Sequence, residues 1–199
     1  MRRMCACGNI FLERTLVSRL KGLFSVAGKT ALITGGGSGI GGFMAQSLSE
    51  EGGTVLLVGR REDKLKEVLG ARDGKIFVID LCEAGASERL FTMVTDCGYQ
   101  PDIIVNAAGI NPRLHADKID EEMWTYTVHL NLNVPFLVAQ KFVPGMKANG
   151  WGRIINIASM QSNRAFPNGI SYGSAKGGVT QLTRAMAEAW SAHGITCLL

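Results

Sequence analysis

Three side chains between residues 159 and 176 carry groups that could act together on one carbonyl: the hydroxyl of Ser159, the phenol of Tyr172 and the ammonium of Lys176. Tyr172 and Lys176 are four residues apart, so on a helix they share one face. A phenol has a pKa of about 10, and a nearby ammonium lowers that value by favouring the phenolate. Such a phenol is a usable general acid or base. The three residues therefore predict a site for hydride transfer to or from a carbonyl carbon.

The segment before Ser159 is the element that would hold it. Residues 154–158 form an apolar run that predicts a buried parallel strand ending at the serine. Ligands of open α/β sheets bind where strand ends face helix starts. Because a Tyr-x-x-x-Lys spacing can arise by chance, the upstream chain must supply the context.

A glycine-rich loop near the start of the chain has the pattern of a dinucleotide site. Residues 30–34 predict a short apolar strand before it, and Met44 and Leu48 continue a helical pattern after it. Glycines let the backbone approach a pyrophosphate, and a helix N-terminus presents unpaired N–H groups to it. The alternative is a glycine-rich turn without a ligand. The candidate cofactor residues here are Thr34, Gly35, Gly37, Ser38, Gly39, Ile40 and Gly41.

Two arginines follow the second predicted strand, residues 54–58. An Asp or Glu at this strand end would bind a ribose 2′-OH, but Gly59 cannot accept that hydrogen bond. Arg60 and Arg61 could instead pair with a 2′-phosphate. This favours NADP as the cofactor, with NAD as the alternative. The other interpretation of the two arginines is a solvated positive turn that opens the next helix.

Two further strand ends complete the predicted site. Residues 76–79 predict a third strand, after which Asp80 and Leu81 could border an adenine ring. Residues 102–105 predict a fourth strand, followed by residues small enough to leave room for a nicotinamide ribose. These following residues are Asn106, Ala107, Ala108 and Gly109.

Helices are expected between the later strands, around residues 84–97, over 120–149, and from the Ser159–Lys176 segment to about residue 193. Pro135 is expected to kink the second of these. Asn131 and Asn133 lie in its apolar middle, where a polar side chain usually bonds to backbone.

The alternation of strands and helices predicts an α/β fold with a doubly wound parallel sheet, the Rossmann fold. The length of 199 residues suits one domain. We divide the chain into a basic N-terminal extension, residues 1–28, and a dinucleotide-binding domain, residues 29–199. Residues 195–199 predict a sixth strand at which the sequence stops, so the sheet is expected to be incomplete at its C-terminal edge.

The net charge of +4 is concentrated at the N-terminus. Residues 1–29 hold six basic residues and one acidic, which leaves 15 basic and 16 acidic residues in the rest of the chain. The rest therefore lacks the basic footprint of a nucleic-acid-binding protein. No apolar run approaches the roughly 18 residues that span a bilayer. Five cysteines without a C-x-x-C pair indicate reduced thiols and no metal site. We expect neither a nucleic acid nor a membrane as partner.

The N-terminal extension bears on localisation. Leu12, Leu16 and Leu20 share a helical face in this basic segment, as in a mitochondrial presequence. The alternatives are an extra surface helix, or unused residues that an upstream start codon adds. We expect a cytoplasmic protein, with mitochondria as the alternative.

Taken in order, four motifs resemble those of the short-chain dehydrogenase/reductase family, over residues 28–199. Residues 34–41 resemble its cofactor loop, and residues 106–109 its fourth-strand motif, with alanine where a second asparagine is common. Asn131 stands seven residues after Trp124, where the family has its helix asparagine. The last motif is the family's catalytic set, completed by Ser159, Tyr172 and Lys176. The nearest members by sequence are gluconate 5-dehydrogenases, with 3-oxoacyl carrier-protein reductases next.

The resemblance implies a role for each catalytic residue. Tyr172 would exchange the proton with the substrate oxygen, and Ser159 would hold that oxygen. Lys176 would bind the nicotinamide ribose, so Tyr172 and Lys176 are also cofactor contacts, and Asn131 would fix a proton-relay water. The substrate would be a secondary alcohol or ketone, and the family's full-length members imply a homo-oligomer.

Polar residues in two loops favour a sugar acid such as gluconate as the substrate. An arginine in either loop could clamp a carboxylate bidentately. The alternative is that these side chains face solvent. The residues are Arg113, His115, Gln161, Asn163 and Arg164.

The family normally continues past this point with a substrate-covering segment, so the resemblance implies a C-terminally truncated chain. Two hypotheses remain open. The first is an NADP-preferring oxidoreductase, and the second is a truncated dinucleotide-binding protein without turnover.

Overall fold

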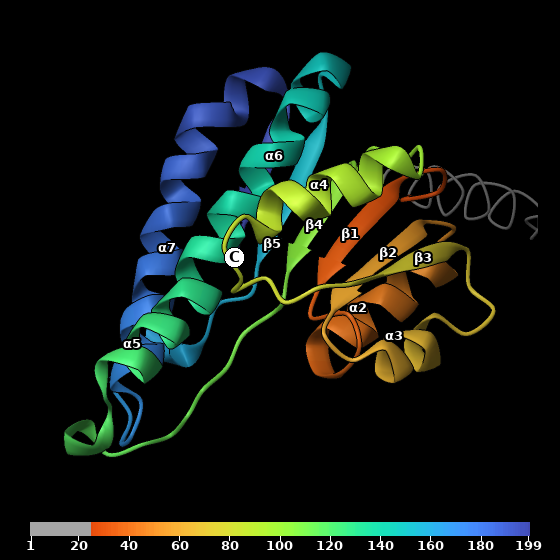
Figure 1. The fold of residues 1–199 in the computed structure, drawn as a ribbon. Coiled ribbons are helices and arrows are strands. Elements are labelled where there is room, and N and C mark those ends of the chain that lie inside the picture. The colour runs from red at the N-terminus through yellow and green to blue at the C-terminus, as the bar shows by residue number, and fades with distance from the viewer. Residues whose placement is uncertain (1–24) are drawn as a thin grey trace, which may run out of the picture.

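A computed structural model describes residues 25–199 and shows a six-stranded parallel sheet with helices on both faces (Figure 1). The strand order is β3-β2-β1-β4-β5-β6, so the chain starts mid-sheet, winds to one edge and then crosses to the other. The predicted doubly wound Rossmann fold is confirmed. The N-terminal extension predicted over residues 1–28 lies outside the described residues except for its last four.

The strands follow the apolar runs of the sequence, because both faces of the sheet are covered. Each pairs in parallel with its neighbour, and Leu32 of the central strand stands opposite both Leu56 and Ile104. The strands are β1 (Thr30–Thr34), β2 (Thr54–Gly59), β3 (Gly74–Val78), β4 (Ile103–Asn106), β5 (Gly152–Asn156) and β6 (Ile195–Leu198). The strand β6 pairs with β5 and forms the edge at which the sequence stops.

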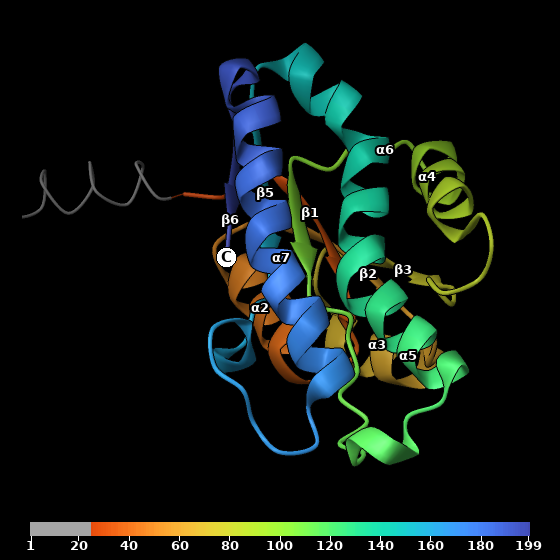
Figure 2. The same cartoon turned by 90° about the vertical axis from the view of Figure 1, so that its left-hand side faces the viewer.

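In the described part of the chain, six α-helices connect or cover these strands. Helices α2 and α3 pack on one face of the sheet, and helices α4, α6 and α7 lie on the other (Figure 1, Figure 2). The helices are α2 (Gly39–Glu50), α3 (Glu62–Leu69), α4 (Ala86–Asp96), α5 (Glu121–Val128), α6 (Val134–Asn149) and α7 (Ile170–Trp190). Short 3-10 turns are η1 (Ala116–Lys118), η3 (Met160–Ser162) and η4 (Ser191–His193).

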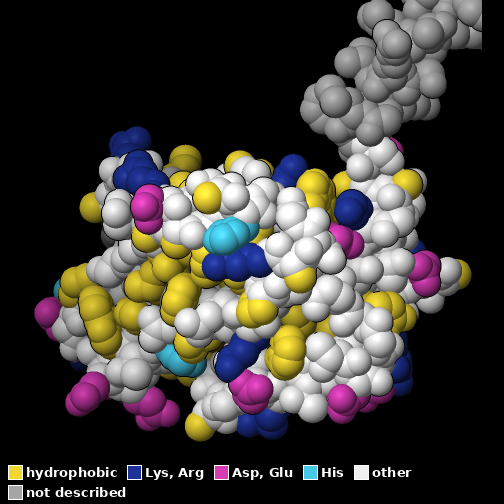
Figure 3. Space-filling view, turned by 90° about the horizontal axis from the view of Figure 1, so that it is seen from above, with side chains coloured by type: hydrophobic (Ala, Val, Ile, Leu, Met, Phe, Trp, Pro, Cys, Tyr) yellow, Lys and Arg dark blue, Asp and Glu magenta, His cyan; other side chains and the backbone are white. Residues whose placement is uncertain are grey.

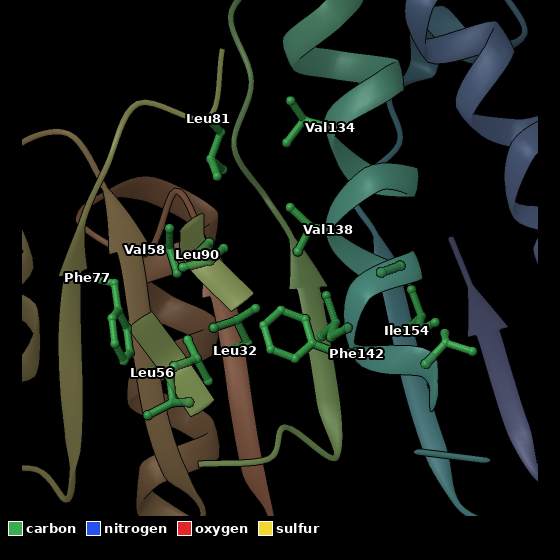
Figure 4. Close-up of a cluster of buried hydrophobic side chains, with 14 of the residues drawn as sticks. Leu32, Leu56, Val58, Phe77, Leu81, Leu90, Val134, Val138, Phe142 and Ile154 are labelled. Atoms are coloured by element: carbon green, nitrogen blue, oxygen red, sulfur yellow. The ribbon is translucent and has the colours of Figure 1, made fainter. Parts of the chain in front are cut away.

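Side chains alternate across the sheet and so form two cores. On one face Leu32, Leu56 and Ile154 pack against Phe142 and Val138 of α6 (Figure 4). On the other face, Ile33 and Leu57 are packed with Ala45 of α2 and Leu65 of α3. The two layers fix the strands from both sides, which holds their C-terminal ends in place.

The helix expected over 120–149 is interrupted. A widened π-helical turn, η2 (His129–Asn133), separates α5 from α6. Pro135 lies in the first turn of α6, where its missing N–H is tolerated. The break thus precedes the proline instead of centring on it, because Pro135 has no N–H to bond the carbonyl of Asn131 four residues earlier.

The arrows of β1 and β4 point downward in Figure 1, so the view from above in Figure 3 shows the side of the molecule at their N-terminal ends, where basic and acidic side chains are interspersed. Within residues 25–199, none of the helices combines the length and the apolar character needed to cross a bilayer. The opposite face, at the C-terminal strand ends, holds the predicted site.

Candidate functional site

A cavity of about 330 Å³ opens at the C-terminal ends of β1 to β4. Its walls come from the glycine-rich loop, the residues after β2 and β3, and the segment after β4. It brings together most of the predicted cofactor residues: Gly35, Gly37, Ser38, Gly39, Ile40, Gly41, Arg60, Arg61, Asp80, Leu81, Ala107, Ala108 and Gly109.

The glycine-rich loop has no space for side chains where it meets the segment after β4. Gly35 has a φ of +68°, and an added Cβ would lie 2.8 Å from the backbone nitrogen of Ala108. A Cβ on Gly41 would lie 2.6 Å from the carbonyl oxygen of Gly35. The α2 helix begins directly after the loop, and the side chain of Ser38 does not cap it. Close backbone packing and free helical N–H groups fit the pyrophosphate of a dinucleotide cofactor.

The two arginines after β2 reach opposite walls of this cavity. Arg61 Nη2 donates a hydrogen bond to Ser38 Oγ at 3.3 Å, on the side of the glycine-rich loop. Arg60 Nη1 donates to Asp80 Oδ2 at 3.4 Å and to Tyr126 Oη at 3.0 Å, on the side of β3 and α5. Both cations therefore border the space where a cofactor's adenosine half would lie.

Two predicted cofactor residues lie beneath the cavity and do not line it. Thr34 is buried, and its Oγ1 accepts a hydrogen bond from the Ala108 backbone at 3.2 Å. Asn106 is also buried, and its Nδ2 donates to Asn156 Oδ1 at 2.8 Å and to the Pro135 carbonyl at 3.3 Å. These side chains join neighbouring strand ends and helix α6, so they support the walls of the cavity.

A buried chain of polar groups continues from Asn106 into α7. Asn156 Nδ2 donates to Thr183 Oγ1 at 2.9 Å, and Thr183 Oγ1 donates to the Val179 carbonyl at 2.8 Å. Asn156 is fully buried, so each of these bonds replaces water. The network fixes the end of β5 against the helix that carries Tyr172 and Lys176.

Tyr172 and Lys176 occupy the first two turns of α7, as their spacing predicts. The Lys176 Nζ atom lies 5.7 Å from the centroid of the Tyr172 ring and donates to the Ile157 carbonyl at 2.6 Å. Lys176 is 5% exposed, and burial lowers its pKa from 10.5 to about 8. The ammonium therefore lies beside the face of the Tyr172 ring, one helical turn along α7.

Asn131 lies in the π-helical turn, and its side chain points toward Gly109. Its Nδ2 donates to the Thr127 and Ile110 carbonyls, both at 2.9 Å. Its Oδ1 is buried and has no hydrogen-bond partner among residues 25–199. A Cβ on Gly109 would lie 2.5 Å from this Oδ1 and 4.0 Å from Lys176 Nζ. Gly109 lines the cavity, so the cavity wall lies close to the lysine and the asparagine, although neither of these side chains lines it.

Ser159 directly precedes the η3 turn after β5 and caps it. Its Oγ accepts a hydrogen bond from the Gln161 backbone at 3.1 Å, and its own N–H donates to Ser162 Oγ at 3.3 Å. This reciprocal capping sets the backbone of the turn. The η3 turn packs against α7, so the serine is held beside the helix of Tyr172 and Lys176.

A second cavity, of about 560 Å³, brings together three of the five polar loop residues. Gln161, Asn163 and Arg164 line it, and the Arg164 guanidinium lies 5.6 Å from the Phe166 ring centroid. Arg113 and His115 do not line this cavity, although their neighbour Ala116 does.

Sequence reasoning missed several residues of the first cavity. Lys64 stands one helical turn after Arg61, and this spacing could have indicated it. Ile110 directly follows the segment after β4. Tyr126 and Leu130 come from the α5–η2 region, which carries no motif that marks them.

The comparisons with known proteins agree with this geometry. The family model described as short chain dehydrogenase matches residues 29–199. A 2-dehydro-3-deoxy-D-gluconate 5-dehydrogenase from Bacillus subtilis is 35% identical over 178 residues, which cover 86% of this chain and 69% of that protein. An NAD-dependent glycerol dehydrogenase from Listeria innocua is 31% identical over 175 residues, which cover 86% of this chain and 68% of that protein.

A solved structure is similar as well. The crystal structure of a gluconate 5-dehydrogenase from Burkholderia cenocepacia, in complex with NADP and tartrate, superposes with a TM-score of 0.81 at 34% identity. The match covers 87% of this chain and 70% of that one. The resemblance seen in the motifs is confirmed: the chain belongs to the short chain dehydrogenase family of oxidoreductases.

Proposed function

We propose that this chain binds NADP in the first cavity and interconverts a secondary alcohol and a ketone. The observation that carries the proposal is the meeting point at Gly109, where a glycine-lined cavity adjoins a buried ammonium beside a phenol. Arg60 and Arg61 favour NADP, and a similar structure was crystallised with that cofactor. NAD is the alternative, and one relative is named NAD-dependent.

Four residues act on the substrate oxygen and its proton. The Tyr172 phenol gives the oxygen its proton in reduction and takes it back in oxidation. Ser159 Oγ holds the oxygen by a hydrogen bond. Lys176 stabilises the phenolate and binds the ribose, while Asn131 Oδ1 holds a water that replaces the proton. The bound nicotinamide supplies or accepts the hydride.

The substrate is a polyol or a sugar acid. Relatives named for gluconate derivatives and for glycerol share these hydroxylated substrates, and polar residues line the second cavity. A carboxylate would be held there by Arg164, whose guanidinium can bind it bidentately.

The test is a cofactor titration followed by a turnover assay on the full chain. NADPH binding is followed by its fluorescence, and oxidation by the loss of its near-ultraviolet absorbance, with a panel of neutral ketones and keto-acids. We expect saturable NADPH binding and oxidation with at least one member. Failure to bind either NADPH or NADH would contradict the proposal, and binding without oxidation across the panel would contradict the catalytic half.

A further inference from the structure

The Arg60 guanidinium spans one end of the first cavity and joins three separate elements. Arg60 follows β2, Asp80 follows β3 and Tyr126 lies on α5, and all three residues line the cavity. The Arg60 Nη1 atom donates to Tyr126 Oη at 3.0 Å and to Asp80 Oδ2 at 3.4 Å. The contact with the Asp80 carboxylate is the longer of the two, so the Tyr126 phenol is the closer anchor.

The two anchors use one edge of the guanidinium and leave the other free. A guanidinium carries five N–H donors. Both acceptors bind at Nη1, which leaves the donors on Nη2 and Nε for a ligand. Two parallel N–H groups on that edge match two oxygens of a phosphate. The anchoring is therefore compatible with a bidentate contact to a 2′-phosphate.

The anchors differ in charge. Asp80 is held in place by the backbone N–H of Cys82, which donates to its Oδ1 at 2.9 Å, and its negative charge opposes a phosphate nearby. Tyr126 orients the arginine without that opposing charge. Burial raises the pKa of the Tyr126 phenol, so the group stays neutral around neutral pH.

We propose that Tyr126 is a positioning residue for Arg60 and thereby strengthens the preference for NADP over NAD. The Arg60 side chain is 58% exposed, so without an anchor it would sample many rotamers. Fixing it before the cofactor arrives removes part of the entropy cost of binding. This inference rests on the proposed function, because it concerns the 2′-phosphate of the same cofactor.

Arg61 and Lys64 limit the size of the effect. Both line the same cavity, and Arg61 is anchored separately on Ser38. A 2′-phosphate would still contact Arg61 and Lys64 when Arg60 is no longer anchored by Tyr126. The loss of one neutral hydrogen bond to Arg60 should therefore weaken NADPH binding only by about three- to tenfold.

The experiment compares NADPH and NADH dissociation constants for the full chain and its Tyr126→Phe variant. The variant removes only the hydroxyl, so we expect the Kd for NADPH to rise by about three- to tenfold and that for NADH to change by less than about twofold. Tyr99→Phe is the matched control, since Tyr99 packs against the same core cluster and does not line the cavity. The control should leave both constants unchanged.

A double-mutant cycle tests whether the hydroxyl acts through the arginine. In an Arg60→Met background, Tyr126→Phe should have no further effect on NADPH binding. An equal loss for NADPH and NADH, no loss for NADPH, or the same loss in the Arg60→Met background would each overturn the inference. A general loss of folding would weaken both cofactors alike, so their ratio decides. If the unaltered chain bound neither cofactor, the proposed function itself would fail.

Discussion

At the ends of β1 to β3 the candidate site is shaped by backbone and exposed cations, whereas at the ends of β4 and β5 it is built from buried, hydrogen-bonded side chains. The first region depends on what is missing, since Gly35 and Gly41 have no space for a Cβ. The second depends on what is present, since Asn131, Asn156 and Lys176 are buried and hold fixed partners. A phosphate can be bound by any well-placed N–H or cation, but proton transfer needs particular atoms at particular positions.

The largest effect is expected at the phenol in the second region. Tyr172→Phe removes the proton donor and keeps the ring, so kcat should fall by at least about a hundredfold. The Kd for NADPH and the thermal unfolding temperature should stay close to those of the unaltered chain. A steady-state assay, a fluorescence titration and a thermal melt measure the three quantities. Turnover that persists at its original rate would remove Tyr172 from the mechanism.

The next effect tests the first region. Gly35→Ala combines a left-handed backbone with a Cβ only 2.8 Å from Ala108 N, so we expect it to lower the free energy of unfolding by about 2–4 kcal/mol. Gly150→Ala is the matched control, because Gly150 has a φ of +63° but an added Cβ would meet nothing within 4 Å. The Gly150→Ala variant should lower the free energy of unfolding by about 1 kcal/mol. Equal costs in denaturant titrations would show that the close packing of the loop contributes nothing.

A smaller loss of stability is expected in the buried network. Asn156→Ala leaves Asn106 Nδ2 and Thr183 Oγ1 each with one partner fewer, so unfolding free energy should fall by about 1–3 kcal/mol. The exposed residue Asn149 offers a control, and Asn149→Ala should leave stability within about 0.5 kcal/mol. If both variants unfold at the same denaturant concentration, the network does not stabilise the end of β5.

An effect of similar size, seen only as a pH dependence, is expected from Lys176. Its pKa is 10.5 when exposed and about 8 in the fold, so between these values the unfolded chain holds a proton that the folded chain lacks. Stability then rises with pH across that window. The Lys176→Met variant has no titrating group at this position and so lacks this pH dependence. The difference in unfolding free energy, unaltered chain minus variant, should grow by about 1–3 kcal/mol from pH 8 to 10.5. A constant difference would mean that the ammonium is solvated.

The strands, the glycine-rich loop and the Tyr172–Lys176 pair could be predicted because each is encoded locally. A run of apolar residues, a cluster of glycines or a spacing of four is visible within a few positions. The other features depend on contacts between residues that are far apart in the sequence. The fifth strand was expected to run to residue 158 but ends at Asn156, beyond which Lys176, nineteen positions later, takes the Ile157 carbonyl.

The α5–η2 region likewise could not be predicted in full from its local sequence. Its residues look like the first part of one long helix, and although Pro135 indicates a kink, the local pattern does not show that the break is a widened turn before the proline. Tyr126 could not be assigned to the cavity because its partner Arg60 lies 66 positions away. The catalytic and cofactor roles of the residues remain predictions that the variants above test.

The widened turn before Pro135 has a lasting consequence for how the two regions are joined. A ring nitrogen without hydrogen cannot donate the bond that a regular α-helix would make to the Asn131 carbonyl, so Pro135 favours the offset between α5 and α6. Tyr126, on one side of the offset, binds Arg60, while Asn131, within it, points its Oδ1 toward Gly109. An uninterrupted α-helix would rotate these two side chains relative to one another, so the widened turn sets the angle between them.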